Sequence, residues 1–277
     1  MNALYTLMDA VLPFEWLGYT FMKNALLAML LIAPLFGMLG TMAVDNRMAF
    51  FSDALGHSAL TGIAIGVLLG WQDQMASMLL FGILWAVLIT FVKHHSKMSA
   101  DTIISVFSST SMALGLVVLS RGGAFAKYSS LLVGDVLSVT QADIAGLAAA
   151  LVFVCLIWAV LFNPLLLTSV NAPLAQSRGV RAKATEYCFT IVVAIAVMMS
   201  IRWVGVLLIN SLLILPAAAS RNVARNAAWY MRFSVLISVV CGVAGLVLSY
   251  YLNTSAGAAV VLCAALIYFA TLPLRRK

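Results

Sequence analysis

Charged side chains are scarce in this 277-residue chain: Asp, Glu, Lys and Arg make up 9% of it, and 64% is hydrophobic. Soluble globular domains carry about 25% charged residues, so the composition excludes a soluble domain. It predicts an all-α protein that crosses a membrane many times, with residues 1–277 forming a single membrane domain. The net charge is +7, but no basic stripe alternates with aromatic residues, which argues against nucleic-acid binding.

Sequence signals of an enzyme are also missing. The chain has no Gly-x-x-x-x-Gly-Lys-Ser/Thr phosphate loop and not even a Gly-Lys pair, so it cannot hydrolyse a nucleotide by that route. No hydrolase-like Ser/His/Asp arrangement and no pair of acidic residues placed for acid/base catalysis is present. The four cysteines stand alone in apolar runs without redox or metal-site spacing, and we interpret them as small packing residues: Cys155, Cys188, Cys241 and Cys263.

Long apolar runs are what the sequence does contain, and they predict eight to nine membrane-spanning helices. A span needs about 20 apolar residues. The candidates are residues 17–39, 48–70, 75–92, 102–120, 141–162, 187–200, 203–219, 231–251 and 256–272. The sixth and seventh are short and are separated only by Ile201 and Arg202, so they form either two crossings or one broken, re-entrant pair.

The distribution of Lys and Arg predicts an N-out, C-in orientation, because cytoplasmic connections are enriched in these residues. With nine crossings and the N-terminus outside, three cations fall in outside connections: Arg121, Lys127 and Arg202. Twelve of the sixteen fall inside: Arg47, Lys93, Lys97, Arg178, Arg181, Lys183, Arg221, Arg225, Arg232, Arg275, Arg276 and Lys277.

Asp53 and His57 are the main candidate site. They stand four residues apart, which is about one helical turn, so they share a face of the second predicted span. An ionisable group inside a span is costly and indicates function, and a carboxylate with an imidazole can bind a metal ion. The structural alternative is that Asp53 caps a helix beginning near Ala54 and that His57 is a satisfied interior histidine.

Other polar residues have weaker functional signals. Asn210 and Ser211 lie in a span and either line a transport pathway or hydrogen-bond neighbouring helices. His94 and His95 predict a solvated basic loop, with metal sensing as the alternative. Helix capping or first-turn chemistry accounts for Asp135 and Asp143, although Asp135 could also meet a partner protein. The pair Gly62 and Gly66 predicts a close helix–helix contact.

Several motifs in one order resemble those of the permease subunits of bacterial zinc/manganese ABC transporters. The first is Arg47-Met48 with Phe51-Ser-Asp53 and Gly56-His57-Ser58-Ala59. The others, which extend the resemblance over nearly the whole chain, are residues 103–117, 130–139, 172–180, 204–221 and 253–266.

This resemblance implies the permease of an ATP-driven importer in the bacterial cytoplasmic (inner) membrane. Its cargo would be a divalent metal ion, with Zn²⁺ favoured and Mn²⁺ next, and it would hold no permanent cofactor. Its implied partners are a second copy of the chain, two cytosolic ATPase subunits, an extracytoplasmic metal-binding protein and membrane lipid. The implied metal ligands are Asp53 and His57.

The resemblance also implies that residues 172–183 form a coupling segment that docks on the ATPase. The residues themselves agree, because this stretch is short, basic, flanked by turn residues and on the predicted cytoplasmic side. Gln176 is polar at a position where a hydrophobic or aromatic side chain would be expected to dock on the ATPase. The coupling residues implied are Pro173, Leu174, Ala175, Gln176, Arg178 and Gly179.

Two other functions stay open at this point. One is a permease for a metal chelate or another small solute, which a wide apolar cavity would favour. The other is a membrane scaffold without transport. The ligand types do not separate zinc from manganese or iron.

Overall fold

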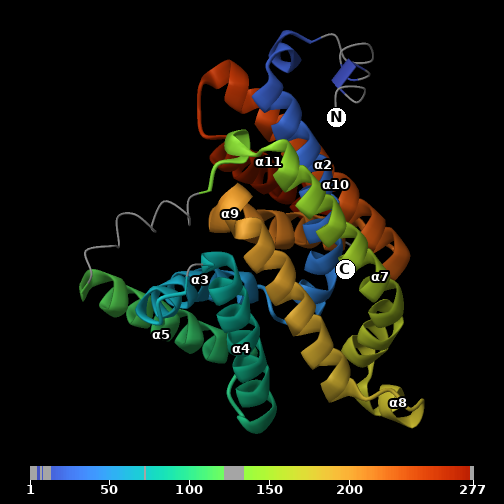
Figure 1. Cartoon of the computed structure of the whole chain (residues 1–277). Helices are drawn as coiled ribbons and strands as arrows, with labels where there is room; N and C mark the ends of the chain where they lie inside the picture. Colours follow the sequence, from blue (N-terminus) through green and yellow to red (C-terminus); the bar gives the residue numbers. More distant parts are fainter. Residues whose placement is uncertain (1–4, 7, 9–13, 72, 122–133, 275–277) are drawn as a thin grey trace. The chain divides into compact units, whose positions relative to one another are not determined.

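The computed structural model describes all residues except 1–4, 7, 9–13, 72, 122–133 and 275–277. Part of the predicted outside connection with Lys127, and the terminal Arg275, Arg276 and Lys277, therefore lie outside the described residues. The described chain is helical, without a strand (Figure 1). Its long helices are α2 (Thr20–Asp45), α3 (Phe51–Leu68), α4 (Gln74–His95), α5 (Ala100–Arg121), α7 (Gln141–Val170), α9 (Ala182–Val223), α10 (Ala227–Leu252) and α11 (Ala256–Thr271).

Four shorter helices complete the described chain: η1 (Glu15–Gly18), η2 (Val136–Ser138), α8 (Ala172–Ser177) and η3 (Leu272–Leu274). The chain divides into two compact units. The first unit holds residues 1–41, 134–152 and 203–277, and the second holds residues 42–133 and 153–202.

Eight helices are long and apolar enough to cross a membrane in the described chain, which confirms the all-α, eight-to-nine-span prediction. The expected sixth and seventh spans both lie in α9, where two helices meet at a kink at Gly205 in place of the expected boundary at Ile201 and Arg202. Gly205 has φ 73° and ψ 164°, a conformation that residues with a side chain rarely adopt. At 1.5 Å per residue an unbroken helix of this length would measure about 63 Å, roughly twice the hydrocarbon core of a bilayer.

Helix α7 corrects a second boundary. We expected its span to end at 162, before Pro164, but the helix continues through Pro164 to Val170. The connection that follows this span therefore begins at Asn171 and not directly after residue 162. Proline removes one backbone hydrogen bond and bends a helix, but membrane helices tolerate it because nearby groups and local adjustments compensate.

The first unit is held together by close helix contacts at small residues. A Cβ on Gly40 of α2 would lie 1.9 Å from the carbonyl oxygen of Leu213, so only glycine fits there. On α10, Ser234 and Ser238 donate hydrogen bonds to the carbonyl oxygens of Gly37 and Ala33, both at 2.7 Å. These hydroxyls satisfy themselves on a neighbouring helix, which stabilises helix association where no water is present.

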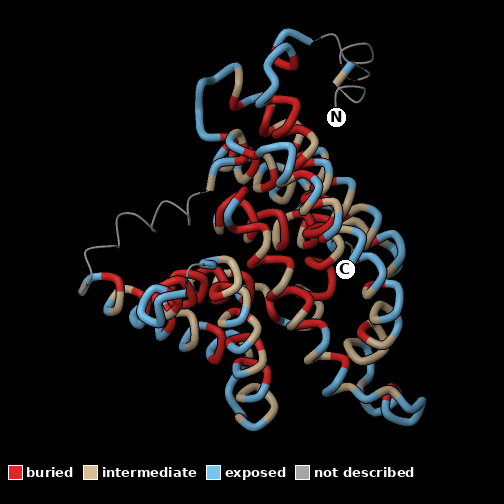
Figure 2. The backbone as a smooth tube through the Cα atoms, viewed as in Figure 1, coloured by how far each residue is buried: buried red, intermediate tan, exposed pale blue. Residues whose placement is uncertain are grey.

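In the second unit α3 packs on both α4 and α5 (Figure 1). A Cβ on Gly62 would lie 2.9 Å from Met78 Cα, and one on Gly66 would lie 2.3 Å from Ser77 Oγ. Ser77 Oγ also donates to Gly62 O at 2.6 Å. The predicted small-residue face is therefore confirmed. Buried residues cover most of α3 but few of α5 (Figure 2). In an apolar 18-residue stretch of each helix, 72% of the residues of α3 are buried but only 28% of those of α5.

A substitution at Gly134 tests how closely its backbone approaches α9 at the Gly205 break. It has φ +61°, and a Cβ on it would lie 2.0 Å from Gly205 N. We expect Gly134→Ala to destabilise the protein by at least about 2 kcal/mol, from left-handed strain plus backbone overlap. The measurement is thermal unfolding in detergent, with Gly18→Ala as the control because nothing lies within 4 Å of its Cβ position. Equal unfolding midpoints for the two variants would contradict the packing argument.

Candidate metal site

The candidate site begins at a tight turn between α2 and α3. Arg47 adopts φ +57°, Arg47 N donates to Val44 O at 3.2 Å, and Met48 N donates to Ala43 O at 2.8 Å. This pair of bonds is a Schellman arrangement, which satisfies the last carbonyls of a helix. It fixes where α2 ends and brings the chain into α3 within a few residues.

Asp53 lies in the first turn of α3 and is not its N-cap. The helix begins at Phe51, and the capping position, Phe50, offers no side-chain hydrogen bond. The alternative in which Asp53 caps a helix beginning near Ala54 is therefore wrong, because the helix starts three residues earlier. A carboxylate in the first turn is still favoured, since the N-terminal end of a helix carries a partial positive charge.

The structure brings Asp53 and His57 together as their spacing predicts. His57 Nε2 lies 3.6 Å from Asp53 Oδ2, with 27% of the His57 and 40% of the Asp53 side chain exposed. The distance is longer than a normal hydrogen bond. Two ligands at about 2.05 Å from one tetrahedral ion are themselves about 3.4 Å apart, a separation close to that of these two atoms.

The second nitrogen of His57 makes the interior-histidine alternative weaker. Nδ1 is buried and has no hydrogen-bond partner among the described residues. A buried imidazole whose role is only structural is normally satisfied at its polar atoms. His57 thus has one nitrogen beside a carboxylate and one that the surrounding described residues leave unbonded.

Helix α5 supplies a polar residue that the sequence did not single out. Ser108 Oγ lies 3.5 Å from Asp53 Oδ2, the same oxygen that faces His57. A cavity of about 650 Å³ opens beside this group, lined by Phe50, Asp53, Asp101, Thr102, Ile104, Ser105, Val106, Ser108 and Ser109. Most of these side chains carry oxygen, so the cavity suits a cation or its water shell better than an apolar solute.

Asn210 and Ser211 belong to the first unit, on the part of α9 after Gly205. Ser211 is buried and donates to Leu208 O, three residues earlier, at 2.9 Å. Its hydroxyl is therefore satisfied within its own helix and not by a neighbouring helix. Asn210 is half-buried. The role of these two residues in a pathway stays a prediction.

The predicted coupling segment contains α8. Asn171 Oδ1 caps this helix by accepting from Leu174 N at 3.0 Å, and Pro173 stands in its first turn, where proline is well tolerated. Gly179 follows the end of α8 with φ +78°, the left-handed conformation that commonly terminates a helix. Ala175 is fully buried, whereas Leu174 is 43% exposed. Leu174 is thus an exposed apolar side chain beside Gln176.

Lys93 and His94 are not in a solvated loop, as we expected, but in the last turn of α4. Both lie against Glu186 of α9: Lys93 Nζ donates a hydrogen bond to Oε1 at 2.7 Å, and His94 Nε2 lies 3.2 Å from Oε2. These side chains are only 16–21% exposed. His95 Nδ1 lies 2.8 Å from Phe91 O instead. This Lys93–Glu186–His94 clamp accounts for two of the basic residues without metal sensing.

The acidic residues near the predicted outer side act as local caps. Asp135 Oδ1 accepts from Leu137 N at 2.9 Å, and Asp143 Oδ2 accepts from Thr140 N at 3.0 Å. The capping interpretation of both residues is confirmed.

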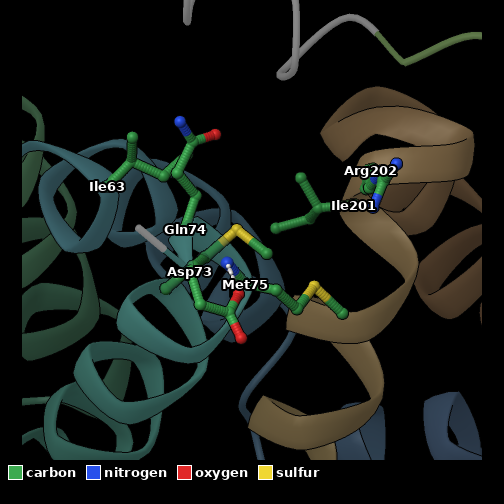
Figure 3. A pocket seen from close by; sticks show the side chains of 7 residues that line it. Ile63, Asp73, Gln74, Met75, Ile201 and Arg202 are labelled. Carbon is green, nitrogen blue, oxygen red and sulfur yellow. Dashed lines mark hydrogen bonds between the residues drawn. The ribbon is translucent and has the colours of Figure 1, made fainter. Parts of the chain in front are cut away.

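A second pocket in the same unit, of about 480 Å³, is shown in Figure 3 and is lined by Ile63, Asp73, Gln74, Met75, Met78, Ile201 and Arg202. Its carboxylate, Asp73, caps α4 by accepting from Met75 N at 2.9 Å. Across the described part of the chain, no group of three or more His, Cys, Asp or Glu residues is placed to hold a metal ion. Asp53 and His57 are therefore two potential ligands without a third His, Cys, Asp or Glu placed beside them among the described residues.

Comparisons with known proteins agree with these features. The profile of the ABC 3 transport family matches residues 18–275. The manganese import system permease protein ScaB of Streptococcus parasanguinis is 32% identical over 262 residues, which cover 94% of this chain and 93% of ScaB. The high-affinity zinc uptake system membrane protein ZnuB of Haemophilus influenzae is 30% identical over 254 residues, covering 91% and 97%. Among solved structures, PsaBC from Streptococcus pneumoniae in complex with Fab matches 98% of this chain and 95% of that chain, with a TM-score of 0.78 at 26% identity.

The Lys93–Glu186–His94 clamp yields a stability prediction. Glu186→Gln removes the charge that pairs with Lys93 and lies beside His94, and we expect a loss of about 2 kcal/mol, because hydrogen bonds to charged groups away from solvent are worth more than neutral ones. The measurement is thermal unfolding in detergent. The matched control is Glu15→Gln, since Glu15 is the chain's other glutamate and is exposed. The clamp carries no stability if both variants unfold at the wild-type temperature.

Proposed function

The chain belongs to the ABC 3 transport family, and we propose that it is the membrane permease through which an ATP-driven importer moves a divalent metal ion into the cytoplasm. The observation that carries the choice of cargo is the pairing of Asp53 Oδ2 and His57 Nε2 at 3.6 Å in the first turns of an apolar helix. An imidazole and a carboxylate at this separation are ligands for a small divalent cation. The oxygen-rich lining of the adjoining cavity favours this cargo over a bulky chelate.

Two ligands in one copy are too few for a stable site, so we propose that a second copy of the chain completes it. Two-fold symmetry would supply up to two carboxylates and two imidazoles. Four such ligands suit tetrahedral Zn²⁺, and Mn²⁺ accepts the same groups with added water. Zinc is favoured and manganese is next; relatives named for manganese and for zinc support a divalent metal cargo and do not separate the two. The ion is cargo and is not a resident cofactor.

We further propose that ATP hydrolysis takes place in two cytosolic partner subunits and that an extracytoplasmic binding protein delivers the metal. The chain would lie in the bacterial cytoplasmic membrane with its N-terminus outside and its C-terminus inside, in contact with lipid. The charge distribution supports this orientation if α9 crosses the membrane twice, once on each side of Gly205.

Replacing either ligand tests the cargo. We expect Asp53→Ala and His57→Ala each to abolish metal uptake, because a site of so few ligands loses its affinity with any one of them. Assembly with the ATPase should persist, since the substitutions lie away from α8. The measurement is uptake of zinc, manganese and iron, scored separately, in cells that express the complete importer. Wild-type uptake by both variants would overturn the site assignment.

Coupling to the ATPase is proposed for residues 172–183, with Leu174 as the apolar anchor that Gln176 does not provide. Leu174 is exposed on α8. Helix α9 begins at Ala182, soon after α8, and its Glu186 holds Lys93 and His94 of α4. A shift of α8 would therefore act on α9 and, through the clamp, on the helix that packs against α3.

Leu174 gives a test of this coupling. We expect Leu174→Asp to reduce co-purification of the ATPase at least about tenfold, because a charge would enter an apolar docking pocket and anchor residues carry most of the energy of an interface. Leu174→Met should retain the ATPase. Ser177→Ala is the matched control on the same helix, since the Ser177 hydroxyl bonds only to Leu174 O. Full retention of the ATPase by Leu174→Asp would move the anchor elsewhere.

A further inference from the structure

The hydroxyl groups of α5 fall into two classes. Three of its seven hydroxyl side chains are satisfied by its own backbone: Thr110 donates to Val106 O at 2.7 Å, Ser111 to Ser108 O at 2.9 Å and Ser120 to Val117 O at 3.1 Å. This local bonding is the usual way in which a membrane helix accommodates serine and threonine.

Among the hydroxyls that face the 650 Å³ cavity, Thr102 Oγ1 lies 2.7 Å from Ser99 Oγ, whereas three serines have no such local partner among the described residues. Ser105, Ser108 and Ser109 line it, and none of the three donates a hydrogen bond to a carbonyl of α5 within the described chain. Ser108 Oγ lies 3.5 Å from Asp53 Oδ2. Ser105 and Ser109 are exposed. Their spacing of three and four residues places all three on one face of the helix.

Exposed, locally unbonded hydroxyls are costly against lipid, where no other group can satisfy them. Their place beside a carboxylate explains them better as the wall of an aqueous cation pathway. Asp53 Oδ2 is the meeting point, since it faces His57 Nε2 at 3.6 Å and Ser108 Oγ at 3.5 Å. Two oxygens and one nitrogen, each a potential metal ligand, thus lie close together where α3 faces α5.

We propose that Ser108, with Ser105 and Ser109 beside it, is a specificity-determining residue that adds neutral oxygen donors to a cation held by Asp53 and His57. The inference rests on the proposed function and deepens it. Zn²⁺ is usually bound by four ligands, which commonly include imidazole nitrogen. Mn²⁺ prefers more oxygen ligands in an octahedral arrangement. Serine oxygens and the waters they hold therefore extend transport from zinc to manganese.

The hydroxyl of Ser108 also restrains the Asp53 carboxylate, because it contacts the oxygen that faces His57. Ser108 is a positioning residue in this respect. A hydroxyl contributes less than a charged ligand, so its removal should change the preference between metals without abolishing transport.

The test compares Ser108→Ala, which removes the oxygen, with Ser108→Thr, which retains it. The matched control is Ser120→Ala, on the same helix but bonded to its own backbone and outside the cavity. Initial uptake rates of manganese and zinc are measured over a range of concentrations in cells that express the complete importer. We expect the manganese-to-zinc ratio of uptake efficiency to fall about tenfold in Ser108→Ala and to stay at the wild-type value in Ser108→Thr and Ser120→Ala.

An equal fall for both metals in Ser108→Ala would show a structural role only, and an unchanged ratio at normal rates would show no role; either result overturns the inference. If Ser108→Ala does not reach the membrane, Ser109→Ala carries the same test, with a smaller fall expected and the same overturning results. Failure of the proposed function is distinguishable, because it would appear as continued uptake in Asp53→Ala and His57→Ala. Loss of uptake there with an unchanged ratio in the serine variants would overturn the specificity inference alone.

Discussion

A carboxylate in an apolar helix is costly in free energy, and the position of Asp53 in the second unit reduces this cost. Asp53 is tolerated because it stands in the first turn of α3, where the helix end is partly positive, and because part of its side chain faces a cavity lined by oxygen-bearing groups. The tight turn at Arg47 sets this position by ending α2 and starting α3 a few residues later. Moving the helix start would bury the charge or remove it from His57.

Small residues allow the neighbouring helices to pack closely against α3, which carries Asp53. Gly62 and Gly66 let α4 approach α3 on one side. On the other side, Thr61 Oγ1 donates to Ser111 O, and a Cβ on Gly115 would lie 3.0 Å from Thr61 Oγ1. Helix α3 is therefore held on both α4 and α5, and the contact with α5 sets the position of Ser108 relative to Asp53. The first unit uses the same method, with Gly40 against Leu213 and serine hydroxyls on backbone carbonyls.

The sequence predicted what depends on local spacing and hydropathy, and it missed what depends on a single conformation or a distant partner. Apolar runs located every long helix, and the four-residue spacing of Asp53 and His57 placed them together. Hydropathy predicted a pair of runs or a broken pair in the region of α9 but could not place the break at Gly205, because the break lies in the backbone angles of one residue. Nor could it identify Glu186 as the partner of Lys93, 93 residues away. Ser108 was missed because serine is common in membrane helices and only a tertiary contact distinguishes it.

The types of ligand at the site suit an ion that must leave again. Conduction requires binding that is favourable enough to admit an ion and weak enough to release it. A carboxylate, an imidazole and hydroxyls are moderate ligands, whereas thiolates would hold zinc tightly. Cys155, Cys188, Cys241 and Cys263 all lie on α7, α9, α10 and α11, and none lines the cavity beside Asp53. Partial exposure of both Asp53 and His57 would have the same effect on a metal ion bound by them, because water would compete with these ligands.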